Sequence, residues 1–344
     1  MSTPSSNLNE AALRTYLANV LPGDWTNMSV RQYQGGQSNP TYQVTAGDHS
    51  YVLRKKPGGV LLPSAHAIDR EFRIMSALSG SGVPVPRMLH YCEDASLIGT
   101  AFFVMEWVKG RVLKDALDAS LSAADRRAIW LEMSSVLGKL HALDPAQIGL
   151  ADYGAKGNYF ARQVDRWGKQ YRKSETEAIP AMDRLIEWLP VNIPQDETTT
   201  IVHGDYRIEN LIIHPSEPKV MAVLDWELST LGHPLADLAY SCLPYHLPER
   251  AFWGVADRNF PEAGLPPEKE YVANYLKVSG LKPTGNWGFY IAFALYRLAA
   301  ILQGVLKRAL EGNASSSDGI ERGRLARLCA ETAEQVRDLR FDGA

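Results

Sequence analysis

The chain has 344 residues, of which 45% are hydrophobic and 22% charged, and its formal net charge is -3 at pH 7. This length and composition are typical of a soluble globular protein with a large core, built as two domains or as one domain with lobes. The small negative charge gives no overall attraction to nucleic acid or to an anionic membrane. Cys92, Cys242 and Cys329 are too few and too scattered for a disulfide framework or a zinc cluster. The first residues, "MSTPSSNLNEAALRTYL", lack the basic and apolar regions of a secretory signal, so we expect a cytoplasmic protein.

Residues 28–106 predict a small antiparallel sheet with one inserted helix. Short alternating segments rich in β-branched and aromatic residues ("MSVRQYQ", "TYQVTA", "YVLRKK") are separated by the turn sequences "GGQSNP" and "GDHS". Residues 64–80 then have Ile68, Phe72, Met75 and Leu78 at helical spacing and end in glycine. After the proline-marked loop "GVPVPRML", the segment "TAFFVMEWVKG" predicts another strand. We therefore expect a strand-rich N-terminal domain over residues 1–106.

Residues 107–344 predict a mainly helical second domain. One apolar helix face ends at His141 and comprises Ile129, Met133, Val136, Leu137 and Leu140. The exceptions to helix are the apolar strands that flank the polar part of "IVHGDYRIENLIIHP" (201–215), and "PKVMAVLDW" (218–226), which predicts the second arm of a hairpin with "NLIIHP". A polar loop, "EGNASSSDG" (311–319), precedes a last amphipathic helix.

Residues 287–306 form an apolar run of membrane-span length that carries a single formal charge, Arg297. A charged side chain at the middle of a membrane span is costly. We therefore expect a buried helix of the C-terminal core and no membrane span. Within it, Tyr296 and Arg297 are expected to contribute to core packing, with substrate contact as the alternative.

The polar stretch 203–210 has the spacing of a phosphoryl-transfer loop. His203, Asp205 and Asn210 give the pattern HxDxxxxN, and Asp225 stands at the end of the next apolar strand. Because a hairpin brings its two ends together, Asn210 and Asp225 can share one cation while Asp205 projects beside it. Mg²⁺ favours oxygen ligands, and a carboxylate near an acceptor hydroxyl can position it and take its proton.

Other chemistries find less support in the sequence. His203, Asp205, His214 and His233 lie close enough along the chain to suggest a zinc hydrolase, but no HExxH or similar helical pairing is present. The GxxxxGK[ST] sequence of a Walker-type nucleotide binder is absent, as is the GxGxxG of a dinucleotide-binding oxidoreductase. A dehydrogenase activity is therefore not expected of this chain.

The two blocks "HGDYRIENLI" and "AVLDWELSTLGHPLADLA" resemble the aminoglycoside phosphotransferase (APH)-like family of small-molecule kinases, relatives of choline kinases and of eukaryotic-like protein kinases. The segment "YVLRKKPGGVLLPSAHAIDREFRIMSAL" is similar, more narrowly, to the branch fused to or encoded beside acyl-CoA dehydrogenases. The resemblance covers roughly residues 27–310. It implies an α+β, protein kinase-like bilobal fold, with an N-terminal antiparallel sheet lobe containing one helix and a mainly helical C-terminal lobe. It also implies an ATP- and Mg²⁺-dependent kinase that binds ATP between the lobes.

The resemblance implies roles for the residues of the polar loop. Asp205 would be the catalytic base, Asn210 and Asp225 the Mg²⁺ ligands, and His203 a support for the loop. Arg207 is a further catalytic candidate, because its charge could stabilise the transferring phosphoryl group. Among neighbouring acids, Glu209 is expected to brace the loop or lie at the surface, and Asp237 to brace the catalytic loop or cap a helix.

The resemblance also implies a nucleotide site in the N-terminal lobe. Arg54 falls where the family has its phosphate-binding cation, with Lys55 as the alternative that strand alternation points the other way, and Glu71 would pair with that cation. The hairpin over the phosphates would place three residues nearest to them: Gly35, Gly36 and Ser38. The hinge that meets adenine would comprise Met105, Glu106 and Val108. An arginine still supplies permanent charge and a planar fork for phosphate oxygens. Trp226-Glu227 after Asp225 makes a kinase-style flip of this segment unexpected.

The acceptor is set only by the resemblance. In the acyl-CoA dehydrogenase branch the kinases are implicated in phosphorylating hydroxyacyl-CoA intermediates, so a hydroxyacyl-CoA acceptor and a functional link to an acyl-CoA dehydrogenase are implied. Aminoglycoside, choline and homoserine-like acceptors stay open, and so does a nucleotide-binding pseudokinase that serves as a regulatory module. The preference for ATP over GTP, the oligomeric state and the extent of lobe closure are left open by the sequence.

Overall fold

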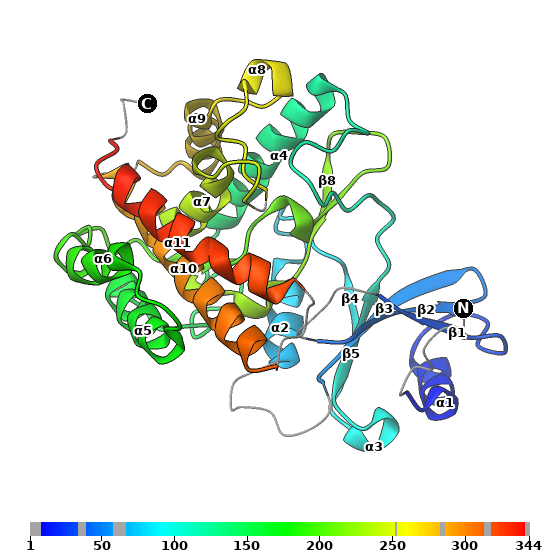
Figure 1. The fold of residues 1–344 in the computed structure, drawn as a ribbon. Coiled ribbons are helices and arrows are strands. Elements are labelled where there is room, and N and C mark those ends of the chain that lie inside the picture. The colour runs from blue at the N-terminus through cyan, green and yellow to red at the C-terminus, as the bar shows by residue number, and fades with distance from the viewer. Residues whose placement is uncertain are drawn as a thin grey trace. The chain divides into compact units, whose positions relative to one another are not determined.

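The computed structural model describes residues 8–33, 39–57, 67–251, 253–282, 286–312 and 318–340. The chain divides into two compact units (Figure 1). The first comprises Met1–Arg111 and Met221–Glu227, and the second comprises Val112–Val220 and Leu228–Ala344. The first unit thus extends five residues beyond the expected boundary at 106. It also includes the short segment Met221–Glu227, which contains Asp225.

A five-stranded antiparallel sheet forms the centre of the first unit, with the strand order β1-β2-β3-β5-β4. The strands are β1 (Ser29–Gln32), β2 (Thr41–Ala46), β3 (His49–Lys55), β4 (Met88–Cys92) and β5 (Phe102–Glu106). Strands β2 and β3 form a hairpin in which Ala46 pairs with His49, and Gly47 of its two-residue turn has a φ of 59° that favours glycine. The antiparallel sheet predicted for the N-terminal lobe is therefore present.

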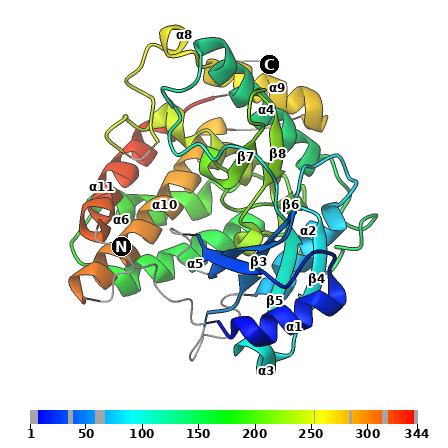
Figure 2. The same cartoon turned by 90° about the vertical axis from the view of Figure 1, so that its right-hand side faces the viewer.

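The two faces of this sheet receive different helices (Figure 2). Helix α1 (Glu10–Val20) buries Leu13 and Leu17 in one core with Leu53 of β3 and Phe102 of β5. Helix α2 (Ile68–Leu78) packs on β4 and β5, and its Phe72 ring lies 6.2 Å from that of Phe103. Since successive strand side chains point to opposite faces, the neighbour of Leu53, which is Arg54, points to the face that carries α2.

The second unit is mainly helical, as predicted. Its longer helices are α4 (Ala123–His141), α5 (Tyr159–Ser174), α6 (Pro180–Val191), α7 (Pro234–Ser241), α9 (Glu268–Ser279), α10 (Trp287–Leu310) and α11 (Gly319–Val336). The apolar face predicted for α4 is buried in full. One short sheet accompanies the helices, in which β6 (Thr200–Val202) pairs with β9 (Thr230–Gly232). The predicted hairpin is also present, because β7 (Leu211–Ile213) pairs with β8 (Val220–Val223).

Helix α10 forms the centre of the second unit. Among the described residues it is the one helix with the length and composition of a membrane span, and 83% of its most apolar window is buried inside the protein. Helix α11 lies beside it (orange and red in Figure 1). The approach is so close that a Cβ added at Gly323 of α11 would lie 2.5 Å from Leu306 Cβ. The buried helix expected over residues 287–306 is therefore confirmed.

Several elements were not predicted. Helix α1 precedes the region analysed for strands, the one-turn helix α3 (Ala95–Ile98) precedes β5, and β9 follows the Asp225 segment. Strand β4 occupies the end of the proline-marked segment that was expected to be a loop. The prolines at 84 and 86 precede the strand, so they do not interrupt its ladder.

Candidate active site

The catalytic loop predicted at 203–210 connects β6 to the single-turn helix η1 (Ile208–Asn210) and to β7. Gly204 has a φ of 85°, which favours glycine. A Cβ at this position would also lie 2.8 Å from the carbonyl oxygen of Leu228. Any larger residue would shift the backbone that carries Asp205, so the loop conformation depends on glycine here.

Asp237 of α7 holds the first two residues of this loop. Its carboxylate accepts hydrogen bonds from the backbone N–H of His203 and from that of Gly204, the latter at 2.9 Å. Burial raises the pKa of Asp237, but the hydrogen bond and charge of His141, with His203 and the Gly204 N–H, outweigh burial and lower it overall. His203 is fully buried, and its Nδ1 accepts a hydrogen bond from the Asp205 N–H at 3.2 Å. The structural interpretations of Asp237 and His203 are both confirmed.

Both oxygens of the Asp205 carboxylate accept hydrogen bonds from neighbouring side chains. Tyr240 Oη donates to Oδ1 at 2.6 Å. Asn210 Nδ2 donates to Oδ2 at 3.0 Å and to the Asp205 carbonyl at 2.9 Å, and Arg207 Nε lies 3.4 Å from Oδ2. Arg207 also pairs with Glu209, whose carboxylate is 2.7 Å from Nη1. The structure thus brings Asp205, Arg207 and Asn210 together, with Glu209 bracing the arginine.

Arg297 is the charged residue at the middle of the apolar helix α10, and it points toward the catalytic loop. Its Nη2 donates a hydrogen bond to the Gly204 carbonyl at 2.8 Å. Its guanidinium lies between two aromatic rings, 5.5 Å from the centroid of Trp167 and 5.6 Å from that of Tyr240. These contacts stabilise the positive charge of Arg297 within a largely buried helix. They also hold the catalytic loop in place, a role that the position of Arg297 in the sequence did not indicate.

A second group of charged residues lies in the first unit, and we call it the cation cluster: Arg54, Glu71, Asp225 and Glu227. Arg54 Nε lies 2.9 Å from Glu71 Oε2, and its Nη2 lies 2.8 Å from Asp225 Oδ1 and 3.6 Å from Glu227 Oε2. Asn39 donates to the other oxygen of Glu71 at 2.8 Å. Glu71 is only 1% exposed, so it is a buried residue of α2 and does not face the solvent.

The electrostatics of the cation cluster follow from three carboxylates around one guanidinium. Burial raises the pKa of Glu71, the charges of Asp225 and Glu227 raise it further, and Arg54 only partly opposes them, so that it reaches about 7. For Arg54, burial lowers the pKa, but the three carboxylates outweigh burial and raise it overall. The guanidinium is therefore held as a permanent cation among an excess of acids.

Lys55, the alternative phosphate-binding cation, occupies different surroundings. It is 8% exposed, and burial lowers the pKa of its ammonium group. Because strand side chains alternate, Lys55 points to the face of the sheet opposite Arg54. Of these two basic residues, Arg54 is the one in contact with Glu71 and Asp225.

The expected hinge follows β5. Met105 is a buried residue of that strand and pairs with Val52 of β3. The Glu106 N–H is bonded to the Arg87 carbonyl at 3.0 Å, and Val108 lies half-buried in the segment after the strand. Three other residues expected to contact the nucleotide, Gly35, Gly36 and Ser38, lie outside the described residues.

Asn210 and Asp225 supply donor atoms suited to Mg²⁺. Because Asn210 Nδ2 is bonded to Asp205, its amide oxygen is the atom that can serve as a ligand. Asp225 has a φ of 64°, rare for a residue with a side chain, and its Oδ1 is bonded to Arg54. No group of three or more His, Cys, Asp or Glu suited to a metal occurs in the described parts of the chain. Each of the two residues, taken by itself, offers an oxygen of the kind that Mg²⁺ prefers.

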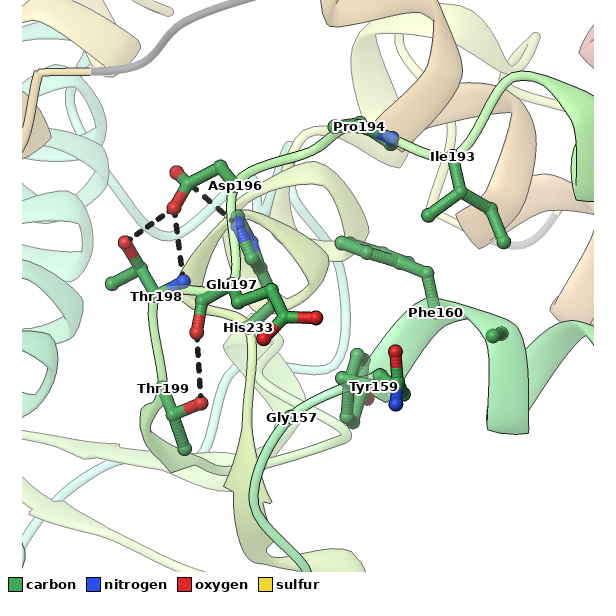
Figure 3. Close-up of a pocket in the computed structure, with 12 residues that line it drawn as sticks. Gly157, Tyr159, Phe160, Ile193, Pro194, Asp196, Glu197, Thr198, Thr199 and His233 are labelled. Carbon is green, nitrogen blue, oxygen red and sulfur yellow. Dashed lines mark hydrogen bonds and ion pairs between the residues drawn. The ribbon is translucent and has the colours of Figure 1, made fainter.

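His233, a residue of the zinc hypothesis, has a structural role in the second unit. It borders a cavity of about 40 Å³ that is also lined by Phe160, Asp196 and Thr198 (Figure 3). Its Nδ1 accepts from the Leu235 N–H at 3.2 Å and so caps α7, while its Nε2 lies 3.5 Å from Asp196 Oδ2. Burial lowers the pKa of His233 to about 4, against the opposing effect of Asp196. A neutral imidazole is what this cap requires.

Comparisons with known proteins place the chain among phosphotransferases by sequence. The profile described as the phosphotransferase enzyme family matches residues 29–271. The chain is 50% identical over 325 residues to mouse acyl-CoA dehydrogenase family member 10, covering 94% of the chain and 30% of that protein. It is 41% identical over 340 residues to human acyl-CoA dehydrogenase family member 11, covering 97% of the chain and 44% of that protein. The chain thus spans less than half the length of these relatives.

Solved structures agree with the sequence comparisons. A Ralstonia eutropha protein provisionally named an aminoglycoside phosphotransferase is 47% identical, with a TM-score of 0.88 over 96% of this chain and 98% of its own. A spectinomycin phosphotransferase in complex with ADP and spectinomycin is 14% identical, with a TM-score of 0.64 over 96% of this chain and 98% of its own. Choline kinase from Cryptosporidium parvum is 13% identical, with a TM-score of 0.63 over 95% of this chain and 96% of its own. At these low identities, the spectinomycin phosphotransferase and the choline kinase show only that the fold is shared. That fold is the expected kinase-like fold.

Proposed function

The chain belongs to the phosphotransferase enzyme family, and we propose that it transfers the γ-phosphoryl group of ATP to a hydroxyl group of a small molecule. The observation that carries this proposal is the surroundings of Asp205. Its carboxylate stands at the end of a braced loop and is fixed by donors on both oxygens. A carboxylate fixed in this way can align an acceptor hydroxyl and accept its proton.

In the proposed reaction the acceptor oxygen forms a bond to the γ-phosphorus, the bond from that phosphorus to the β–γ bridging oxygen breaks, and the hydroxyl proton passes to Asp205. Arg207, 3.4 Å from Asp205, supplies positive charge beside the reacting oxygen. We assign ATP phosphate binding to Arg54, whose planar fork suits phosphate oxygens. Asn210 and Asp225 would hold Mg²⁺, which when bound neutralises part of the phosphate charge.

For the acceptor we propose a hydroxyacyl-CoA. Support comes from the relatives that share this segment, which are acyl-CoA dehydrogenase family members and more than twice as long as the part that matches. Phosphorylation of a hydroxyl group on an acyl chain converts it into a better leaving group. A functional link to an acyl-CoA dehydrogenase, which acts on acyl-CoA thioesters, is part of the same proposal.

A scan of acceptors tests the proposal. The purified protein is incubated with ATP and Mg²⁺ and one of 3-hydroxybutyryl-CoA, 4-hydroxybutyryl-CoA, choline, homoserine or an aminoglycoside. ADP release is followed, and the acceptor is examined for the added phosphoryl group by mass spectrometry. We expect turnover with a hydroxyacyl-CoA. Turnover only with another acceptor would replace the substrate class and keep the kinase.

The arginine at the phosphate-cation position, held by three carboxylates, favours one rival function, a nucleotide-binding pseudokinase. The same assay separates the two. Nucleotide binding without ADP release above the blank, for every acceptor in the set and for GTP as well as ATP, would reject the kinase and support the pseudokinase.

A further inference from the structure

Tyr240 contacts the carboxylate of Asp205 at a shorter distance than Asn210 or Arg207 does. Its phenolic oxygen lies 2.6 Å from Asp205 Oδ1, which is the length of a charge-assisted O–H···O⁻ hydrogen bond. The tyrosine comes from α7, three residues after Asp237, so one short helix both anchors the loop backbone and reaches the side chain at its tip. No pattern in the sequence links Tyr240 to Asp205, which lies 35 residues away.

The side chain of Tyr240 is itself fixed in place. It is 8% exposed, and its ring meets the Trp253 ring at 6.3 Å in an edge-to-face arrangement. The guanidinium of Arg297 lies 5.6 Å from the centroid of the same ring and also donates to the Gly204 carbonyl at 2.8 Å. Tyr240 therefore cannot rotate away without breaking packing that also holds the residue preceding Asp205.

The phenol can act only as a donor in this position. An ionised Asp205 carboxylate has no proton to give, so the hydrogen between the two oxygens belongs to the tyrosine. Burial, followed by the negative charge of Asp205, raises the pKa of Tyr240 and keeps the phenol protonated.

We propose that Tyr240 is a positioning residue of the phosphoryl transfer, which sets the orientation of the Asp205 carboxylate by donating to the oxygen that Asn210 does not contact. This inference rests on the kinase function proposed above. Asn210 and Arg207 both approach Oδ2, whereas Tyr240 donates to Oδ1. With donors on one oxygen alone, the carboxylate could turn about its Cβ–Cγ bond. With both oxygens held, its remaining lone pairs keep one direction toward the acceptor hydroxyl.

The variant that isolates this role is Tyr240→Phe, which removes one oxygen and keeps the ring against Arg297 and Trp253. A purely structural role would lower stability without a specific loss of turnover. Tyr245→Phe is the matched control: Tyr245 is 6% exposed, and its hydroxyl donates to the Pro266 carbonyl at 2.9 Å, away from the catalytic loop.

The three proteins are compared for kcat and KM with ATP, Mg²⁺ and the acceptor that wild type turns over fastest, and for melting temperature. We expect Tyr240→Phe to lower kcat about tenfold, the size expected for one hydrogen bond to a charged group, with KM for ATP within about twofold. Tyr245→Phe should keep kcat within about twofold. Any loss of melting temperature should be similar in the two variants.

Two results would overturn the inference: a kcat of Tyr240→Phe within about twofold of wild type, or an equal loss of kcat in Tyr245→Phe. Both leave the proposed function intact, since wild type turns over in each. Absence of wild-type turnover with every acceptor would instead reject the proposed function, and the inference with it.

Discussion

The cation cluster of the first unit and the catalytic loop of the second are built on different balances of charge. In the cluster, one guanidinium faces three carboxylates, and the most buried of them, Glu71, has its pKa raised to about 7. In the loop, the buried Asp237 receives backbone N–H groups, and Asp205 receives the donors of neighbouring side chains. The loop carboxylates are thus satisfied within the protein, while the cluster carries more negative charge than its arginine neutralises.

The catalytic loop is therefore preorganised, whereas the cation cluster is expected to change when a ligand binds. A hydrogen-bonded carboxylate on a braced loop needs little rearrangement before reaction. A cluster with surplus carboxylate charge gains from an added cation, and a phosphate bound by Arg54, as proposed above, would compete with Glu71, Asp225 and Glu227 for the guanidinium. We therefore expect ligand-dependent change in the cluster and rigidity in the loop.

Asp237→Ala should destabilise the second unit most, by about 3 to 5 kcal/mol, because it leaves two buried N–H groups and His141 without their carboxylate. The free energy of unfolding, measured with a chemical denaturant, checks this value. Asp165→Ala, which removes an exposed carboxylate paired with Lys169 at 2.8 Å, is the control and should cost less than about 1 kcal/mol. Equal costs for the two variants would show that the loop does not depend on Asp237.

Acid should weaken the second unit through His233. Its pKa in the folded state is about 4, below the ordinary 6.5, so the unfolded chain binds a proton that the folded one does not. Stability is therefore full above pH 6.5 and is lost as the pH falls through about 4, by up to about 3 kcal/mol. His233→Asn keeps an N-cap acceptor and removes the titration. Denaturation between pH 7 and 4.5 should show a flatter slope for the variant, and parallel slopes would contradict the prediction.

The first unit should respond in the opposite direction, through Glu71. Its folded-state pKa of about 7 lies above the ordinary 4.5, so the folded state keeps a proton that the unfolded chain has released. The stabilisation is full below pH 4.5 and is lost as the pH rises through about 7, by about 2 to 3 kcal/mol. Local hydrogen exchange of α2 and β3, compared between wild type and Glu71→Gln across this range, measures it. A constant difference between the two proteins would refute the assignment.

The smallest effect should come from Arg297→Lys. The variant keeps the charge but loses the planar group that lies between Trp167 and Tyr240 and donates to the Gly204 carbonyl. We expect a loss of about 1 kcal/mol, with faster hydrogen exchange confined to the loop around residues 203–206. An unchanged exchange rate in that loop would show that Arg297 serves packing alone.

The sequence predicted the parts of the site that depend on local spacing. His203, Asp205 and Asn210 share one loop. The family resemblance pointed to Arg54, and strand alternation indicated that Lys55 points the other way. Tyr240 and Arg297 could not be predicted, because their contacts with the loop depend on how α7 and α10 pack, which no local pattern specifies. Strand β4 was missed for a different reason: the prolines that suggested a loop end just before it begins.

We propose that Asp205 acts in the transfer step and not in nucleotide binding. The most direct measurement compares wild type with Asp205→Ala, using turnover of the best acceptor and the dissociation constant for ATP measured by calorimetry. We predict that kcat falls about a thousandfold, within the range for a lost general base, while the dissociation constant changes less than about threefold. Full turnover by the variant, or a loss explained entirely by weaker ATP binding, would contradict the claim.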